Sequence, residues 1–226
     1  MRRIHGRHAA LTLTTLLVLG AGCSAPRSLP AVKASGDRYF ERKDFDSALT
    51  DYQEYVNRDP GDPSVRISLA KTLLVAHRPT EAVEHAQIAY DQRTTDEDAI
   101  ETLAHSLLDA GRQDEMNRLL RGLAETRGHT GDYIRLGRYL HLSGDADGAE
   151  LALKQAARLD SGRTIAPQMA LADFYHDIHD KPNELKRLRM ALFIEPHNET
   201  ILKRLRELGE VPGPSLALQP EEWGTP

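Results

Sequence analysis

Few residues of this sequence have the type and spacing that catalysis or metal binding requires. His176 and His179 stand three positions apart in the acidic run 173–180, and two imidazoles with a carboxylate can hold a divalent metal. The run straddles a predicted turn, however, where polar residues are expected on structural grounds alone. The chain has no phosphate-binding glycine loop, no G-x-S-x-G elbow and no H-E-x-x-H motif. We therefore expect a protein that is not an enzyme, with no metal site and no cofactor, and an enzyme using the two histidines is the remote alternative.

Cys23 has a more specific setting. It is the only cysteine, which excludes an intramolecular disulfide and a cysteine-based zinc site. Residues 1–8 contain three arginines and no acid, and residues 9–22 are uncharged and rich in Leu and Thr. Those fourteen residues are too few to cross a bilayer core, which needs about 20. A basic start followed by a short apolar run is typical of a secretory signal peptide.

The residues before Cys23 resemble the lipobox of bacterial lipoproteins, in which a small residue precedes the cysteine that becomes the lipidated N-terminus. Gly22 is that small residue here. The sequence departs from the family at Gly20, where Leu is most common, and has Leu19 one position earlier. An ordinary export signal or membrane anchor with a chance cysteine is the alternative.

The resemblance implies a cellular location for the protein. Residues 1–22 would be removed, Cys23 would carry the lipid that anchors the protein to the membrane, and residues 23–30 would form a flexible tether. Ser24 follows the cysteine. In enteric-type bacteria, Ser at that position usually accompanies transport to the outer membrane. We expect an outer-membrane lipoprotein that faces the periplasm.

Composition favours helices. The 226 residues include 31 Leu and 26 Ala but only 7 Val and 9 Ile, and the first pair favours helices while the second favours strands. The formal net charge is −5 with both signs interspersed, and no basic stripe is present, so we expect no nucleic-acid partner. Aromatic residues make up 5% of the chain, too few to favour a sugar- or peptidoglycan-binding module that stacks rings on sugars.

The chain repeats five times. Anchor positions recur at intervals of 34, 34, 33 and 35 residues, at Ala48, Ala82, Met116, Ala149 and Glu184. Twelve residues before each anchor stands a small residue, at Gly36, Ala70, Ala104, Gly137 and Ala172. Apolar residues four and seven after each anchor continue a helical face, and turn-forming residues separate the two faces of each unit. This pattern predicts five helical hairpins, since small residues let paired helices approach closely.

These residues resemble the tetratricopeptide repeat (TPR), a 34-residue helical hairpin, from about Leu29 to Asn198. The resemblance implies an all-α fold, a TPR superhelix. After it, Ile201, Leu202, Leu205 and Leu208 form one apolar stripe, which predicts a capping helix over the last open core. We therefore expect a solenoid over residues 31–209. Residues 210–226 contain four prolines and little periodicity, and we predict a disordered Pro-rich tail.

By the resemblance, the first helix of each hairpin lines the concave face. A peptide or helix of a protein partner would lie in that groove. The predicted groove residues alternate apolar and polar groups, and two of them, in the second and fourth hairpins, are cations at equivalent positions. They are Lys33, Phe40, Ile67, Lys71, Leu74, His105, Leu108, Ile134, Arg138, His141 and Met169.

Together these features predict a non-catalytic, lipid-anchored TPR scaffold that binds a protein partner and assists assembly of an envelope machine. In size and layout the chain resembles the small TPR lipoproteins of type IV or Tad-type pilus biogenesis, which assist secretin assembly. Other envelope TPR lipoproteins recruit cell-wall hydrolases or organise outer-membrane protein assembly. The repeat pattern leaves these alternatives open.

Overall fold

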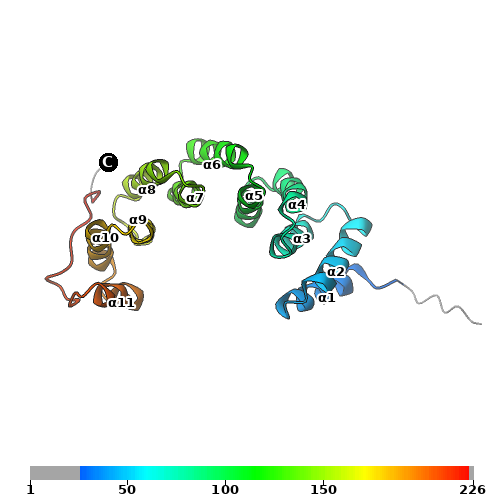
Figure 1. Cartoon of the computed structure of the whole chain (residues 1–226), viewed down its shortest axis with the longest axis horizontal. Helices are drawn as coiled ribbons and strands as arrows, with labels where there is room; N and C mark the ends of the chain where they lie inside the picture. The colour runs from blue at the N-terminus through cyan, green and yellow to red at the C-terminus, as the bar shows by residue number, and fades with distance from the viewer. Residues whose placement is uncertain (1–25, 224–226) are drawn as a thin grey trace, which may run out of the picture.

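The computed structural model describes residues 26–223, and the predicted signal peptide and Cys23 lie outside them. Within the described residues the chain forms eleven helices and no strand, arranged as an open arc (Figure 1). The helices pair into the five predicted hairpins and one further helix. They are α1 (Leu29–Glu41) with α2 (Phe45–Arg58), α3 (Pro63–Val75) with α4 (Pro79–Gln92), α5 (Glu97–Asp109) with α6 (Gln113–Arg127), α7 (Thr130–Leu142) with α8 (Ala146–Asp160), α9 (Ala166–Asp177) with α10 (Lys181–Ile194), and then α11 (Glu199–Glu207).

One turn geometry closes all five hairpins. In each, a residue just after the first helix has a left-handed backbone, at Lys43, His77, Gly111, Gly144 and His179. The N–H of the next residue then donates to the carbonyl five positions earlier, over 2.8–2.9 Å in every hairpin. This bond is the hallmark of the Schellman motif, which satisfies carbonyls that a helix end leaves unpaired. The repeat is therefore present in the backbone as well as in the side-chain pattern.

The two helices of a hairpin meet at the small residues that the sequence analysis singled out. A Cβ added at Gly36 would lie 2.8 Å from the Tyr52 ring, and one at Gly137 would lie 2.6 Å from Leu153 Cγ. Ala70, Ala104 and Ala172 are fully buried at the equivalent positions. Because these contacts leave no room for larger groups, the small residues fix the distance between paired helices.

The core runs through every hairpin and ends under α11. Ile201 and Leu205 of α11 are fully buried against α9 and α10, and Leu202 and Leu208 pack at the edge of the same cluster. The predicted capping helix is thus in place. No helix within residues 26–223 has the length and apolar character needed to span a bilayer.

Both ends of the predicted solenoid need correction. Helix α1 begins at Leu29 rather than after residue 30, because Pro30 occupies the first turn, where the missing N–H is unneeded, and Ser28 caps the helix. Residues 210–223 do not form the predicted disordered tail. They lie against α10, with Leu218 N–H donating to the Arg189 carbonyl over 3.0 Å and Arg189 Nε donating to the Leu216 carbonyl over 2.7 Å.

The packing at Gly137 gives a matched pair of tests. Replacing Gly137 with Ala should lower the free energy of unfolding by about 1–3 kcal/mol, because the new methyl group would overpack against Leu153. Replacing Gly122 with Ala, in the middle of α6, should raise the free energy of unfolding by up to about 1 kcal/mol. No atom lies within 4 Å of a Cβ added there, and Ala has the higher helix propensity. Urea unfolding followed by circular dichroism measures both. If Gly137→Ala leaves the free energy of unfolding unchanged, the contact of Gly137 with Leu153 does not set the helix spacing.

Candidate functional site

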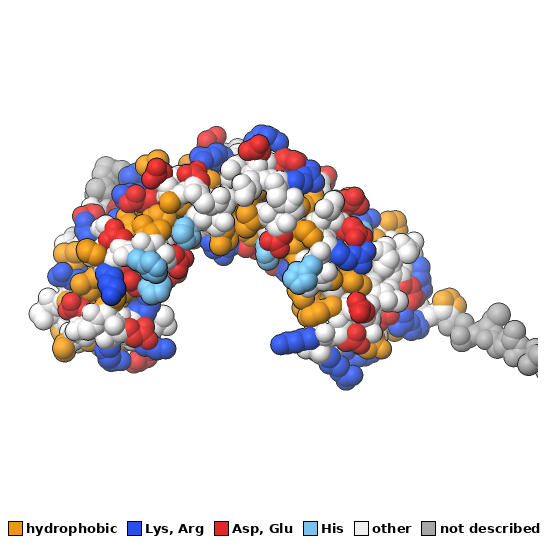
Figure 2. Space-filling model, viewed as in Figure 1, with side chains coloured by type: hydrophobic (Ala, Val, Ile, Leu, Met, Phe, Trp, Pro, Cys, Tyr) orange, Lys and Arg blue, Asp and Glu red, His pale blue; other side chains and the backbone are white. Residues whose placement is uncertain are grey.

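The concave side of the arc is the candidate partner site. Helices α3, α5, α7 and α9 lie on the inner side, with α4, α6, α8 and α10 behind them (Figure 1). In the space-filling view this inner side is hollowed and carries several histidine side chains and apolar groups (Figure 2). The first helix of each of these hairpins therefore faces the hollow, as the resemblance implied.

The predicted apolar groove residues divide into two groups. Phe40, Leu74 and Leu108 are half-buried and pack against the main core while keeping part of their surface exposed. Ile67 is only 6% exposed and packs with Ala89 and Ala99. The prediction that Ile67 lines the groove is wrong, because this side chain fills the contact between the second and third hairpins.

Four of the predicted residues meet in one pocket between α7 and α9. Ile134, Arg138, His141 and Met169 line this cavity of about 270 Å³. Six further side chains complete the lining, namely Leu153, Ala166, Ala170, Asp173, Phe174 and Asp177. The lining is apolar with a few charged groups, which is the composition of sites that bind a side chain and fix its orientation.

His141 is held in a defined orientation at this pocket. Its Nε2 lies 3.3 Å from Asp177 Oδ2, and its ring meets the Phe174 ring edge to face at 5.2 Å between centroids. Both partners come from α9, so His141 joins the two helices that form the pocket. A partner side chain would therefore enter a pocket whose shape is already set.

The predicted cations of the groove already have carboxylate partners. Lys33 Nζ lies 2.8 Å from Asp37, and Lys71 Nζ lies 3.2 Å from Asp98 of the next hairpin. Arg138 donates to Glu101 of the preceding hairpin. The groove therefore contains no isolated positive charge among these three cations. A carboxylate of a partner would have to compete with carboxylates of the chain. His105, also predicted for the groove, is exposed and pairs with Asp109 at 3.5 Å.

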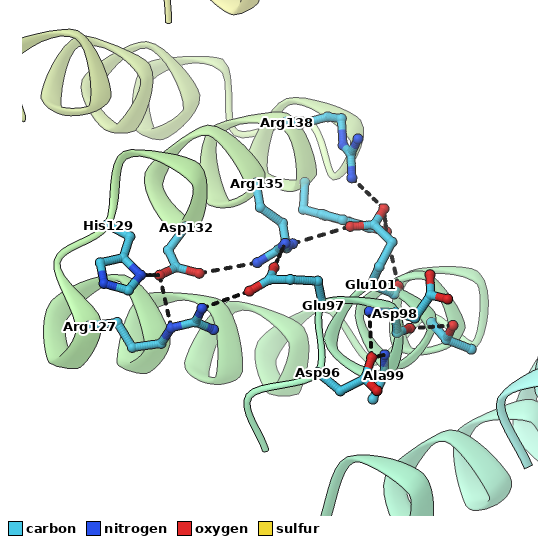
Figure 3. Close-up of polar contacts among 12 residues, drawn as sticks. Asp96, Glu97, Asp98, Ala99, Glu101, Arg127, His129, Asp132, Arg135 and Arg138 are labelled. Atoms are coloured by element: carbon cyan, nitrogen blue, oxygen red, sulfur yellow. Dashed lines mark hydrogen bonds and ion pairs between the residues drawn. The ribbon is translucent and has the colours of Figure 1, made fainter. Parts of the chain in front are cut away.

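A charged network that sequence reasoning missed joins the third and fourth hairpins (Figure 3). Arg135 of α7 pairs with Glu97 and Glu101 of α5, and Arg127 of α6 lies 2.6 Å from Glu97 and 3.2 Å from the buried Asp132. Hydrogen bonds from Arg127 and then Arg135 lower the pKa of the Glu97 carboxyl. The spacing of Glu97 and Glu101, four apart on one face of α5, was the available signal.

The histidines first considered for a metal have other roles in the structure. His176 Nδ1 lies 3.2 Å from both carboxylate oxygens of Glu184, and His179 occupies the left-handed turn position of the fifth hairpin. Among residues 26–223 no three His, Cys, Asp or Glu side chains gather in a way that could hold a metal ion. The two histidines thus act in the hairpin and its turn.

Glu184, the unusual anchor of the fifth repeat, is explained by α11. Its carboxylate is buried and accepts a hydrogen bond from Arg204 Nη2 over 2.8 Å. Arg204 also pairs with Asp173 of α9. A charged anchor is tolerated here because the capping helix supplies a cation, which only the three-dimensional structure brings into view.

The fold is that of the tetratricopeptide-repeat proteins, and the all-α TPR superhelix predicted from the sequence is confirmed. The chain is similar to a thermophilic TPR protein of Thermus thermophilus, with 20% identity over 80% of this chain and 98% of that one and a TM-score of 0.54. It is also similar to PilF of Pseudomonas aeruginosa, with 15% identity over 80% and 82% and a TM-score of 0.53.

A third similar structure is MamA residues 41 to the end from Desulfovibrio magneticus RS-1, with 16% identity over 76% and 97% and a TM-score of 0.54. No family model matches the chain, and no curated protein matches it. At these identities the likenesses establish the fold alone.

The network around Glu97 predicts a pH-dependent contribution to stability. Because the folded-state pKa of Glu97 is lowered, its contribution is present above the unfolded pKa of about 4.3 and is lost as the pH falls through the folded value. Glu97→Gln should therefore destabilise the protein at pH 7, by less than about 1 kcal/mol since this side chain is half-exposed. The difference in free energy of unfolding between the parent and Glu97→Gln should become smaller below pH 4.

Urea unfolding at pH 7 and pH 3 measures this difference. Glu125→Gln is the matched control, because Glu125 is exposed on α6 and forms no ion pair with any residue of the described chain. A Glu97→Gln deficit that is the same at both pH values would contradict the assignment.

Proposed function

We propose that this protein is a non-catalytic TPR scaffold that binds a segment of a protein partner along its concave face. The observation that carries the proposal is the preformed pocket between α7 and α9. It combines an apolar lining, through Ile134, Met169 and Phe174, with charged groups at its edge. Recognition of a peptide or helix uses this combination, because apolar side chains supply affinity and polar groups fix register.

In this proposal the apolar contact contributes most of the binding free energy. Burying one large apolar side chain of the partner contributes about 1.5–3 kcal/mol. The charged groups at the edge, Arg138 with Glu101 and His141 with Asp177, are already paired within the chain. They therefore add little affinity. Their effect is to select among partners, because a misplaced partner charge would break an existing pair.

We further propose that a lipid on Cys23 anchors the scaffold to the outer membrane, facing the periplasm. The support is the lipobox-like run before Cys23, together with the way the chain enters the fold. Arg27 pairs with Asp51 at 2.6 Å and Glu54 at 2.5 Å on α2, which fastens residue 27 to the first hairpin. Four residue steps separate it from Cys23, a reach of at most about 14 Å, so the lipid would hold the first hairpin close to the membrane.

The machine that the scaffold would assist is, in our proposal, a type IV or Tad-type pilus with its secretin. Two observations support it: the resemblance of the sequence to the small TPR lipoproteins of these systems, and the likeness of the fold to PilF of Pseudomonas aeruginosa.

Filling the pocket tests the concave site. Ala166 lines the pocket and is the exposed first residue of α9. Ala166→Phe should reduce partner binding at least about tenfold, equivalent to about 1.4 kcal/mol, while the melting temperature changes little. The measurement is photo-crosslinking in cells from a benzophenone amino acid at Leu142, which is exposed on α7 four residues after Arg138 and does not line the pocket.

Ala146→Phe is the matched control, since Ala146 is the exposed first residue of α8 and lies outside this pocket. We expect one protein adduct in the parent and in Ala146→Phe, and a strongly reduced adduct in Ala166→Phe. An adduct of unchanged yield in Ala166→Phe would contradict binding in this pocket.

The anchor has a separate test. Cys23→Ser should leave the precursor uncleaved and without lipid, because the serine hydroxyl does not replace the thiol that receives the lipid. Fractionation of cells, lipid labelling and the mass of the product measure this outcome. A cleaved, lipid-labelled Cys23→Ser protein would contradict the lipoprotein proposal and leave the concave site untouched.

A further inference from the structure

A second cavity lies at the C-terminal end of the arc, away from the concave pocket. It has a volume of about 520 Å³ and opens between α10, α11 and the segment that follows α11. Apolar groups and prolines line it, with two cationic or titratable side chains among them. The lining includes Phe193, His197, Leu202, Arg206, Pro214 and Ala217.

The walls of this cavity are firmly placed. Leu202 and Arg206 stand four residues apart, so they share one face of α11, and the buried Ile201 and Leu205 hold that helix to the core. The opposite wall, around Pro214, is held by the Arg189 side chain, which donates to the Leu216 carbonyl. A ligand would therefore meet an existing cavity and would not have to order its walls.

The polar groups of the cavity lack partners, unlike those of the concave pocket. Arg206 and His197 are exposed, and neither forms an ion pair with any residue between 26 and 223. Arg204, two residues earlier on α11, pairs instead with Asp173 and Glu184. Arg206 thus leaves a guanidinium available at the edge of an apolar cavity, which favours a ligand that joins an apolar group to a carboxylate.

The chain itself gives an example of the chemistry that α10 recognises. The Trp223 ring packs edge to face against the Phe193 ring of α10, at 5.6 Å between centroids. The two residues before Trp223 are acidic and pair with cations of α10, Glu221 with Lys186 at 2.5 Å and Glu222 with Arg187 at 2.9 Å. Phe193 therefore already packs against an aromatic ring that follows two carboxylates, and it remains 39% exposed.

We propose that the cavity is a second binding site, which takes an acidic–aromatic peptide segment of a partner protein. Its aromatic ring would pack against Phe193 and Leu202, and its carboxylate would pair with Arg206. The site is separate from the concave pocket, so the proposal goes beyond the proposed function and stands or falls independently of it.

The test uses a defined probe, the peptide acetyl-Glu-Glu-Trp-amide, with acetyl-Lys-Lys-Trp-amide as its charge-reversed counterpart. The full chain is titrated by NMR, following the methyl groups of Leu202 and Ala217. We expect saturable shifts of both methyl groups with the acidic peptide, and at least tenfold weaker binding of the basic one. Arg206→Glu should weaken the acidic peptide at least tenfold.

Two variants serve as controls. Arg118→Glu makes the same charge change at an exposed residue of α6 and should leave affinity within twofold. Ala166→Phe, which fills the concave pocket, should also leave it unchanged. The proposal is overturned if Arg206→Glu binds as tightly as the parent, or if both peptides bind equally. Displacement of the acidic peptide by an equal concentration of hexanoate would also overturn the proposal, because it would indicate a site for amphiphiles. Dimers in sedimentation would overturn it too, if a second copy of the chain occupies the cavity.

Discussion

The close approach of the two helices in each hairpin is the constraint on which the rest of the structure depends. Gly36 lies against Tyr52 and Gly137 against Leu153, and neither glycine leaves room for a Cβ. Equivalent small residues recur in all five units, and four of the hairpins are closely packed, whereas α5 and α6 of the third hairpin approach each other less closely. The pocket between α7 and α9 depends on this close packing, because Gly137 and Leu153, which meet in the fourth hairpin, both line it.

Where the repeat pattern fails, buried charge pairs take over from small or apolar residues. Glu184 replaces the usual anchor and is matched by Arg204 of α11. Arg187, almost fully buried on α10, donates hydrogen bonds to the Glu222 carboxylate over 2.9 Å and to the side-chain oxygen Oε1 of Gln168 over 3.0 Å. Buried pairs of this kind add little net stability but penalise every arrangement that separates them. They therefore fix where α11 and the C-terminal segment lie, at the end of the solenoid where no further hairpin does so.

The sequence predicts local features of this fold far better than long-range ones. Hairpins, turns and the capping helix follow from spacings of three to seven residues, and all are present. The position of Ile67 on its helix predicts that it lies on the concave face. In the structure, contact with Ala89 and Ala99 of neighbouring helices buries it. The segment after residue 210 lacks periodicity, yet it is ordered by partners such as Arg187, 35 residues away from Glu222. Local composition contains no information about such partners.

The two sites differ in how charge is used, and that difference follows from their positions. On the concave face each first helix lies beside another, so Lys71 and Arg138 find carboxylates on adjacent hairpins and the groove is internally neutralised. Among residues 26–223 no hairpin packs after α11, and Arg206 has no carboxylate partner there. In our two proposals, internal pairing would make the concave pocket selective through the charges that a partner must not disturb, whereas the terminal cavity would attract a carboxylate directly. Within residues 26–223 one repeating unit therefore gives two charge environments, since cations in the middle of the arc pair with the next or preceding hairpin and Arg206 on α11 has no such pair.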